Sequence, residues 1–227
     1  MALKLYFHPL ASFCHKVLMA LYEKDIPFTP RLVDFADPGS SAALLERWAV
    51  GKIPVLEDGE TGRIVPETSI IIEYLEARVP GRHVLLPADA ELRLEARLWD
   101  RFFDMHVQVP MQKIVTDRLR PVGERDARGV AEARSALAVA YDMIERQIAG
   151  KEWIVGDGLT LADCAAAPAL FYAGIVAPFG QGHVGLTGYF ERLLGRPSYA
   201  RVLSEARPYF HMFPYRDEMP ERFVGPL

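Results

Sequence analysis

The sequence predicts a small α/β domain followed by an all-helical domain. Strand and helix patterns alternate over the first eighty residues, whereas helical spacing alone continues from about Glu91 onward. The length of 227 residues allows one large domain or two small ones. Half of the residues are hydrophobic and 11% are aromatic, so we expect a packed core and exclude wholesale disorder.

The chain begins with a predicted strand, a helix and a second extended stretch. Apolar residues alternate with others over residues 3–7, which is the period of a strand. The helix that follows ends near residue 24, and its apolar residues at helical spacing are Val17, Leu18, Leu21 and Tyr22. The next extended stretch covers residues 26–33. A strand, a helix and a strand in this order form a right-handed crossover with parallel strands.

A hairpin and a further helix complete the first domain. Short strands are predicted at residues 55–57 and 63–65, because the turn between them contains two glycines. The apolar stripe of the following helix consists of Ile70, Ile71, Tyr74 and Leu75. This helix is expected to stop at Pro80-Gly81. The order βαβ and then ββα is that of a thioredoxin-like domain, which we assign to residues 1–80.

The second part of the chain, residues 91–227, is predicted to be helical throughout. A long helix covers the apolar positions from Leu92 to Val115, with a kink expected at Pro110. A second helix ends at Gly150. Further helices are expected at about residues 162–175, 188–194 and 198–205. Residues 81–90 form the predicted linker between the two domains.

Composition and charge exclude several classes of protein. With 30 acidic and 26 basic side chains the net charge is −4, so the chain lacks the basic excess typical of nucleic-acid-binding proteins. No apolar run reaches about 18 residues and no signal peptide is apparent, so we expect no membrane partner. Two cysteines, Cys14 and Cys164, are too few for a disulfide scaffold or a thiolate zinc site. We therefore expect a cytoplasmic protein without a metal.

Two motifs in the first domain have the chemistry of a ligand site. Residues 51–56 read Gly-Lys-Ile-Pro-Val-Leu, and Glu67-Thr68 stands directly ahead of the next predicted helix. Thr68 and the free amides of the helix start can bind a carboxylate, while Glu67 can accept a hydrogen bond from an ammonium group. The structural alternatives are an edge-strand proline at Pro54 and an ordinary helix N-cap. Twelve residues separate Pro54 from Glu67, and we favour ligand binding because this spacing resembles that of a known family of ligand-binding proteins.

A third motif precedes a helix of the second domain. Thr160 and Asp163 have the spacing of a capping box, and Leu159 is placed to form a hydrophobic staple. Such a motif starts a helix and has no catalytic role. The motif is therefore evidence for how the chain folds and which family it resembles, and it is no evidence about catalysis.

The combination of these motifs resembles the glutathione S-transferases over nearly the whole chain. The residues that carry the resemblance are Lys52-Ile53-Pro54, Glu67-Thr68 and residues 158–163. The resemblance implies that a cis peptide bond precedes Pro54 and that the backbone of Ile53 pairs with the cysteinyl unit of glutathione. It also implies that Lys52 contacts glutathione and that Glu67 and Thr68 hold its γ-glutamyl end.

The loop between the first strand and the first helix is where thioredoxin-like proteins carry their reactive group, because a helix start stabilises an anion. The resembled family places serine or cysteine where this chain has Ala11. Ser12 is our candidate for the hydrogen-bond donor to the glutathione thiolate. Alternatively Ser12 only caps the helix, or a backbone amide near Ser12 or Phe13 binds the sulfur. We interpret Cys14 as a small buried hydrophobe, and the lack of a second thiol in the motif disfavours disulfide exchange.

The long helix of the second domain supplies the predicted wall of a second-substrate pocket. The apolar candidates for this wall are Phe103, Val107, Met111 and Ile114, with ordinary helix packing as the alternative. Asp100 or Asp104 could reach a glutathione amine across a dimer interface, and the favoured alternative is a solvated or interface salt-bridge role. The Pro-rich tail, residues 213–227, either crosses the site entrance or packs on the surface. The homodimer itself is implied by the resemblance.

The function implied by the resemblance is that of a glutathione transferase with a role in detoxification. It would conjugate glutathione, as co-substrate, to a small apolar electrophile. One alternative keeps the site and changes the reaction to glutathione-dependent reduction or isomerisation. The other is a binding or regulatory protein that has lost the chemistry, for which Ala11 is the main reason.

Overall fold

The computed structural model describes residues 2–79 and 83–225. The elements of its N-terminal part are β1 (Leu3–Phe7), α1 (Ser12–Glu23), β2 (Thr29–Leu32), α2 (Pro38–Arg47), β3 (Val55–Asp58), β4 (Arg63–Pro66) and α3 (Thr68–Arg78). The strands form one sheet in the order β2-β1-β3-β4. Strand β2 is parallel to β1, whereas β3 is antiparallel to both β1 and β4. This is the mixed sheet that the βαβ and ββα patterns predict.

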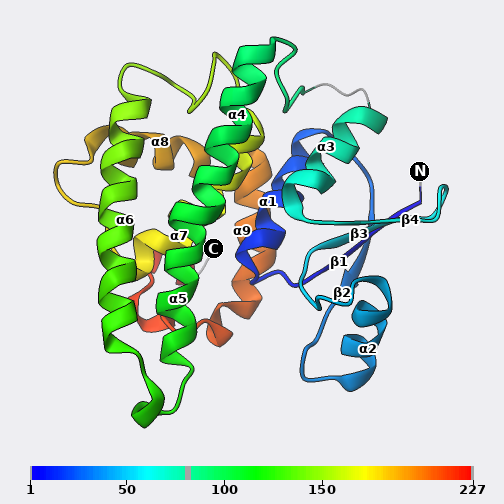
Figure 1. Ribbon diagram of the computed structural model, residues 1–227, viewed down its shortest axis with the longest axis horizontal. Coiled ribbons are helices and arrows are strands. Elements are labelled where there is room, and N and C mark those ends of the chain that lie inside the picture. The colour runs from blue at the N-terminus through cyan, green and yellow to red at the C-terminus, as the bar shows by residue number, and fades with distance from the viewer. Residues whose placement is uncertain (1, 80–82, 226–227) are drawn as a thin grey trace.

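The C-terminal part is helical. Its α-helices are α4 (Ala90–Phe102), α5 (Val109–Arg118), α6 (Ala127–Ile148), α7 (Leu161–Val176), α8 (Val184–Leu194), α9 (Pro197–Ala206) and α10 (Glu221–Val224). Short 3-10 segments cover Val122–Glu124, Arg207–Met212 and Arg216–Glu218. Figure 1 shows the sheet on one side of the molecule and these helices gathered on the other. The predicted class, a thioredoxin-like domain followed by a helical domain, is confirmed.

Helix α1 joins the two parts. It packs against α3 of the sheet domain and against α7 and α9 of the helical domain (Figure 1). Most of its side chains are therefore buried, including the polar His15 and Lys16. The residues just before α1 lie where the two domains meet, so the loop predicted to carry the reactive group is placed at the domain junction.

The capping motif of the second domain is formed as the sequence predicts. The Thr160 side chain accepts a hydrogen bond from the first turn of α7, and the Thr160 amide donates to Asp163 Oδ2 at 2.7 Å. The other carboxylate oxygen of Asp163 accepts a hydrogen bond from the Tyr189 hydroxyl at 2.6 Å. Because Asp163 is fully buried, burial raises its pKa, and these donors compensate for the lost water. The motif anchors α7, which is buried almost along its whole length.

Helix α2 is the element that the sequence pattern misses. The expected order βαβ and ββα has no helix between the second extended stretch and β3, yet α2 begins at Pro38. Only Leu44 of this helix is buried, so it carries no apolar stripe to detect. A local signal was present in Asp37-Pro38, since the Asp37 side chain caps the helix by accepting from the amides of Gly39 and Ser40.

The kink expected at Pro110 takes the form of a π-helical segment. The segment η1 (Phe103–Gln108) connects α4 to α5, and Pro110 is the second residue of α5. A proline there removes one backbone donor from the preceding turn, and wider π-type turns commonly accommodate such a defect. The long helix is therefore interrupted one turn earlier than its proline.

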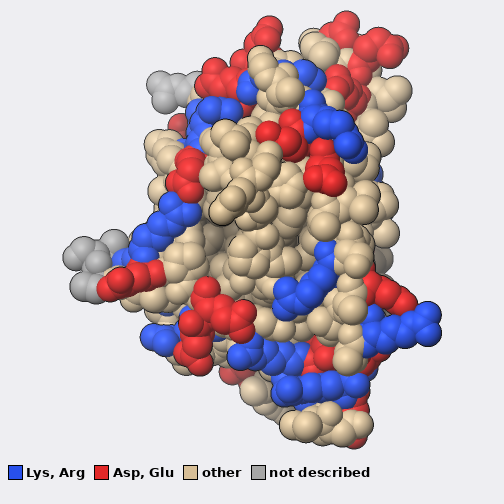
Figure 2. Space-filling view, turned by 90° about the vertical axis from the view of Figure 1, so that its left-hand side faces the viewer, with Lys and Arg blue, Asp and Glu red and all other residues tan. Residues whose placement is uncertain are grey.

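Two expectations concern residues at the domain boundary and on the surface. The predicted helix stop at Pro80-Gly81 and the start of the 81–90 linker lie outside the described residues, and α3 ends at Arg78. Within residues 2–79 and 83–225, no helix has both the length and the apolar character needed to cross a membrane. Figure 2 shows acidic and basic side chains interspersed around a broad uncharged band of the helical face.

Candidate active site

A polar cleft of about 530 Å³ lies between α3 and the start of the helical domain. The residues that line it are Phe13, Trp48, Lys52, Ile53, Pro54, Glu67, Thr68, Ser69, Ile70, Glu73, Arg97, Asp100, Arg101, Asp104, Met105, Val109 and Gln112. The Ile53–Pro54 peptide bond at its edge is cis, as the sequence resemblance implies. The structure thus brings Lys52, Ile53 and Pro54 to one cleft together with Glu67 and Thr68.

Glu67 and Thr68 form the start of α3. Glu67 occupies the N-cap position with φ of 68°, in the left-handed region that side chains other than glycine seldom adopt. Its side chain makes no capping hydrogen bond and is exposed to the cleft, so the reading of this motif as an ordinary N-cap is wrong. Strained backbone of this kind is concentrated at binding sites, where the surrounding structure holds it in place. The carboxylate of Glu67 and the first amides of α3 are therefore available to a ligand.

The floor of the polar cleft is a buried ionic cluster of four side chains. Lys16 Nζ lies 2.7 Å from Asp100 Oδ1 and 2.8 Å from Asp104 Oδ2. Ser69 accepts a hydrogen bond from Lys16 at 3.0 Å and donates one to Asp100 Oδ2 at 2.5 Å. Burial, and then the nearby charge of Asp100, raises the pKa of Asp104, while Lys16 opposes this shift.

This buried ionic cluster connects the two domains. Lys16 comes from α1, Ser69 from α3, Asp100 from α4 and Asp104 from η1. Asp100 and Asp104 therefore form buried salt bridges inside the chain, which differs from the solvated or interface salt bridges expected as the alternative. With one cation and two carboxylates, the cluster leaves a formal negative charge beneath Glu67 and Thr68 when all three groups are ionised.

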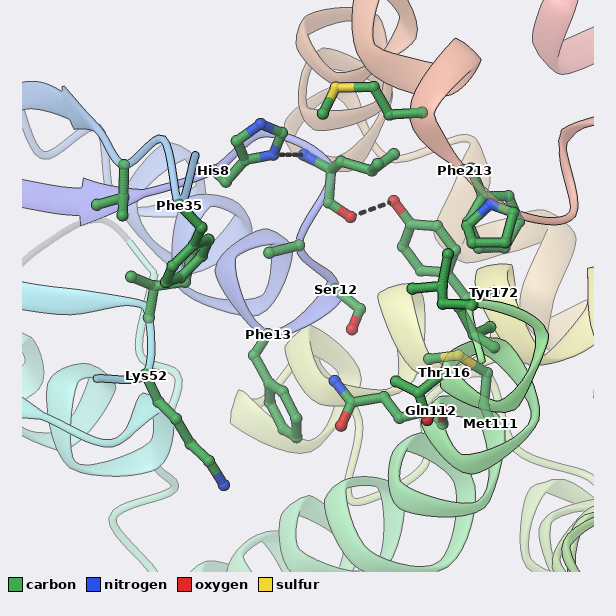
Figure 3. A pocket seen from close by; sticks show the side chains of 18 of the residues that line it. His8, Ser12, Phe13, Phe35, Lys52, Met111, Gln112, Thr116, Tyr172 and Phe213 are labelled. Atoms are coloured by element: carbon green, nitrogen blue, oxygen red, sulfur yellow. Dashed lines mark hydrogen bonds between the residues drawn. The ribbon is translucent and has the colours of Figure 1, made fainter. Parts of the chain in front are cut away.

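An apolar cavity of about 620 Å³ adjoins the polar cleft. The residues that line it are His8, Leu10, Ala11, Ser12, Phe13, Val33, Asp34, Phe35, Ala36, Gly51, Lys52, Ile53, Met111, Gln112, Val115, Thr116, Leu119, Tyr172, Met212, Phe213 and Pro214. Figure 3 shows its walls converging from the loop before α1, from α5 and from the C-terminal tail. The polar cleft and the apolar cavity share Phe13, Lys52, Ile53 and Gln112, so they meet at the start of α1.

Ser12 is the first residue of α1 and lies in the wall of the apolar cavity (Figure 3). Ala11 takes the N-cap position and no side chain caps the helix, so the reading of Ser12 as a capping residue is wrong. The Ser12 residue is only 7% exposed, yet its hydroxyl makes no hydrogen bond with any other residue in the described parts of the chain. A donor and the first amides of a helix thus lie side by side at the cavity.

Hydrogen bonds from the helices fix the loop before α1. His15 Nε2 donates to the Pro9 carbonyl at 2.5 Å. The Tyr172 hydroxyl donates to the Leu10 carbonyl at 2.8 Å, as Figure 3 shows. Burial lowers the pKa of His15 to about 4 and raises that of Tyr172, so both groups are neutral donors at pH 7. Tyr172 was not a sequence candidate, and its position in an apolar helix gives no local sign of this contact.

The two thiols are structural. Cys14 and Cys164 are free and fully buried. Burial raises the pKa of Cys14 to about 12, and it also raises that of Cys164, so neither provides a thiolate at pH 7. The interpretation of Cys14 as a small buried hydrophobe is confirmed.

The predicted second-substrate wall is corrected in three of its four positions. Met111 lines the apolar cavity, whereas Phe103, Val107 and Ile114 are fully buried in the core of the helical domain. The cavity face of α5 follows helical spacing through Met111, Val115 and Leu119. Ile114 lies on the other side of this helix, and an apolar side chain alone does not tell core from cavity.

The remaining wall comes from segments that no motif marks. Phe35 belongs to the stretch after β2, Met212 ends a 3-10 segment, and Phe213 and Pro214 begin the C-terminal tail. The tail therefore adds two residues to the cavity wall, while Tyr215 and Met219 farther along it are buried in the core, which is neither of the two arrangements expected for it. Its residues reach the cavity only through tertiary packing, so the sequence held no signal for their neighbours.

The fold and this site define a two-domain protein with a thioredoxin-like domain and a ligand cleft at its junction with a helical domain. The family description "Glutathione S-transferase, N-terminal domain" matches residues 5–83, and "Glutathione S-transferase, C-terminal domain" matches residues 102–197. The chain belongs to the glutathione S-transferase family.

Individual relatives span most of the molecule. The glutathione S-transferase-like protein LUC7 of Fusarium is 34% identical over 66% of each chain. The FtsZ-localized protein A of Caulobacter vibrioides is 28% identical over 90% of this chain and 92% of its own. A glutathione S-transferase of Methylobacterium radiotolerans, solved in complex with glutathione sulfonate, superposes with a TM-score of 0.77 at 28% identity, covering 89% of this chain and 94% of that one.

Proposed function

We propose that this protein binds glutathione in the polar cleft and conjugates its thiolate to a small apolar electrophile in the adjoining apolar cavity. The observation that carries this proposal is the junction of the two spaces at Phe13, Lys52, Ile53 and Gln112. A ligand spanning that junction would present its middle to the start of α1. Glutathione has charged ends and a central thiol, which suits such a position.

The contacts proposed for glutathione use groups that line the polar cleft. Thr68 and the first amides of α3 bind the γ-glutamyl carboxylate, and Glu67 accepts from the ammonium group. The cysteinyl backbone pairs beside Ile53, while Lys52 and Phe13 cover the rest of the tripeptide. The relative from Methylobacterium radiotolerans was solved in complex with glutathione sulfonate, which supports glutathione as the class of ligand.

Ser12 is the proposed donor to the glutathione sulfur. A glutathione thiol has a pKa near 8.5 by analogy with cysteine, and lowering it by about two units requires about 2.7 kcal/mol of preferential thiolate stabilisation. The free Ser12 hydroxyl and the start of α1 can contribute to this stabilisation. The thiolate then forms a bond to the electrophilic carbon, and either a leaving group departs or the addition product takes up a proton.

A thiolate titration tests the role of Ser12. Ser12→Ala should raise the pKa of bound glutathione, measured from thiolate absorbance, whereas Ser204→Ala on the exposed side of α9 should not. Calorimetry with glutathione first establishes binding by the unchanged protein. An unchanged titration in Ser12→Ala contradicts the role of Ser12, and a backbone amide of α1 then becomes the donor.

A second candidate is a glutathione S-transferase-fold protein that binds a partner without conjugating glutathione. Ala11 at the position of the usual serine or cysteine favours it, as does the likeness to the FtsZ-localized protein A. Absence of glutathione binding in calorimetry would support this candidate. Glutathione binding without conjugation would instead point to reduction or isomerisation, which product analysis distinguishes.

We also propose that the protein is a cytoplasmic homodimer with residues 1–80 and 91–227 as its two domains and 81–90 as the linker. The support for a dimer is a group of exposed apolar side chains around α3, α4 and the start of α5: Ile70, Leu94, Leu98, Met105 and Val109. Light scattering on the purified protein tests it, and a monomeric mass contradicts it.

A further inference from the structure

We propose that Gln112 of α5 donates a carboxamide N–H to the glutathione sulfur, so that the helical domain supplies part of the thiolate site. This inference rests on the proposed function, because it requires glutathione in the polar cleft. It adds a group that the sequence motifs of the first domain do not contain. Gln112 lies at the junction of the two spaces, neighbouring hydroxyls are already engaged, and Ala11 offers no hydroxyl to the sulfur.

Gln112 lies at the junction of the two spaces. Among the described residues that line both the polar cleft and the apolar cavity, it is the one contributed by the helical domain. Its side chain is half-buried, and its carboxamide makes no hydrogen bond with any described residue. In Figure 3 the carboxamide extends from α5 toward the side of the cavity where Ser12 and Phe13 lie. A free polar group therefore faces the start of α1 from the opposite domain.

Other hydroxyls of the same wall are already engaged. Thr116, one turn along α5, donates to the Gln112 backbone carbonyl at 2.7 Å. The Tyr172 hydroxyl donates to the Leu10 carbonyl at 2.8 Å. Among the described residues of this wall, the uncharged side chains that still have an N–H or O–H group to offer are Ser12, Gln112 and His8, whose Nδ1 accepts from the Leu10 amide and whose proton is therefore on Nε2. Of these three, Gln112 also lines the polar cleft.

The chemistry of a thiolate calls for more than one donor. A thiolate sulfur accepts several hydrogen bonds, whereas Ser12 offers a single O–H and the Ala11 methyl offers none. A glutamine carboxamide offers two N–H groups and remains neutral at every pH of interest. It can therefore favour the thiolate over the thiol without introducing a titrating group of its own. Gln112 would compensate in part for the missing hydroxyl at position 11.

The test compares two substitutions of Gln112 with a neighbour on the same wall. Gln112→Leu removes the donors, and Gln112→Glu replaces them by a carboxylate of similar shape that repels the thiolate. Both should raise the pKa of bound glutathione by about one unit, which is about a tenfold loss of thiolate at pH 7. Thr116→Val is the matched control and should leave this pKa unchanged. Calorimetry gives the glutathione Kd of each variant, and absorbance titration gives the pKa.

The outcomes separate this inference from the function on which it rests. Retained glutathione binding with an unshifted pKa in both Gln112 variants overturns the inference and leaves the proposed function standing. In that case, a changed KM for the electrophile alone would assign Gln112 to the second substrate. No glutathione binding by the unchanged protein overturns both. An equal shift in Thr116→Val would mean that the wall acts through its packing, which also overturns the role of Gln112.

Discussion

The polar cleft and the apolar cavity share a boundary but are built in different ways. The polar cleft rests on a buried ionic cluster, in which Lys16 contacts Asp100, Asp104 and Ser69 at 3.0 Å or less. The apolar cavity is walled by aromatic and aliphatic side chains, some of them largely open to solvent. Phe35, for example, is 58% exposed. One space has fixed charges in a rigid frame, whereas the other has adaptable walls.

This difference predicts that the two spaces differ in how strictly they select their ligands. A ligand of the polar cleft must match charged groups whose positions several hydrogen bonds determine, so one lost charge should reduce its affinity strongly. A ligand of the apolar cavity gains mainly from the burial of apolar area, which changes gradually as one side chain is altered. We therefore expect selectivity for the first ligand and tolerance for the second.

The largest effect is expected from Lys16→Met. Removing the cation leaves Asp100 and Asp104 buried without their partner, and breaking a buried ion pair in this way costs about 3–5 kcal/mol. Chemical denaturation should show this loss in the free energy of unfolding. Lys4→Met is the control, because the pair of Lys4 with Glu57 is partly exposed and should contribute less than about 1 kcal/mol. Equal losses in the two variants would contradict the view of the cluster as the rigid frame.

A pH-dependent effect is expected from His15, which holds the Pro9 carbonyl of the loop at the apolar cavity. Burial lowers the pKa of His15 to about 4, whereas in the unfolded chain it returns to about 6.5. The unfolded state therefore takes up a proton first on acidification, so stability falls as pH decreases from about 6.5 to about 4. The contribution reaches at most about 3 kcal/mol.

The measurement is the free energy of unfolding at several pH values in the unchanged protein and in His15→Gln. Other groups titrate over the same range in both proteins, so the difference between the two curves isolates His15. The variant should lose less stability on acidification than the unchanged protein. Parallel curves would show that His15 is not buried in its neutral form.

Glu67→Gln should weaken glutathione binding by about tenfold or more, because a hydrogen bond to a charged group contributes about 1.5–3 kcal/mol. A glutathione analogue that lacks the γ-glutamyl amino group should bind the variant and the unchanged protein equally. Glu73→Gln is the matched control: Glu73 lines the same cleft, but Arg97 already pairs with it at 2.7 and 2.8 Å. Calorimetry with both ligands provides the four affinities, and an equal loss for the analogue would exclude Glu67 as the partner of the ammonium group.

One side of the polar cleft was predictable from the sequence because its two motifs, Lys52-Ile53-Pro54 and Glu67-Thr68, are each local and lie close together along the chain. Ile53-Pro54 and Glu67-Thr68 each sit at the start of a strand or helix, where local geometry determines what a side chain faces. The capping box of α7 was predictable for the same reason, since Thr160 and Asp163 are three residues apart. The buried ionic cluster around Lys16 was not predicted, because the partners of Lys16 come from distant segments of the chain.

The apolar cavity could be predicted only in part. Met111 was found, but Phe103, Val107 and Ile114 fill the helical core, because hydrophobic spacing identifies a buried face without saying what covers it. Phe213 reaches the cavity from the C-terminal tail, and only the packed structure brings it beside the loop before α1. The sequence likewise did not reveal that the Ser12 hydroxyl is free. Ser12 was considered as the N-cap of α1, whereas Ala11, one residue earlier, holds that position.

The smallest effect is expected from Phe35→Ala. Phe35 is 58% exposed at the cavity wall, so a bound apolar electrophile would cover only part of the Phe35 ring. The burial of this area contributes about 1 kcal/mol or less to the binding free energy of the electrophile. The KM for the electrophile should rise a few-fold, while the Kd for glutathione stays the same. Val139→Ala, a similarly exposed apolar position on α6, controls for general surface effects. If Phe35→Ala weakened glutathione as much as the electrophile, the two spaces would act as one site, and the contrast between a rigid cleft and an adaptable cavity would fail.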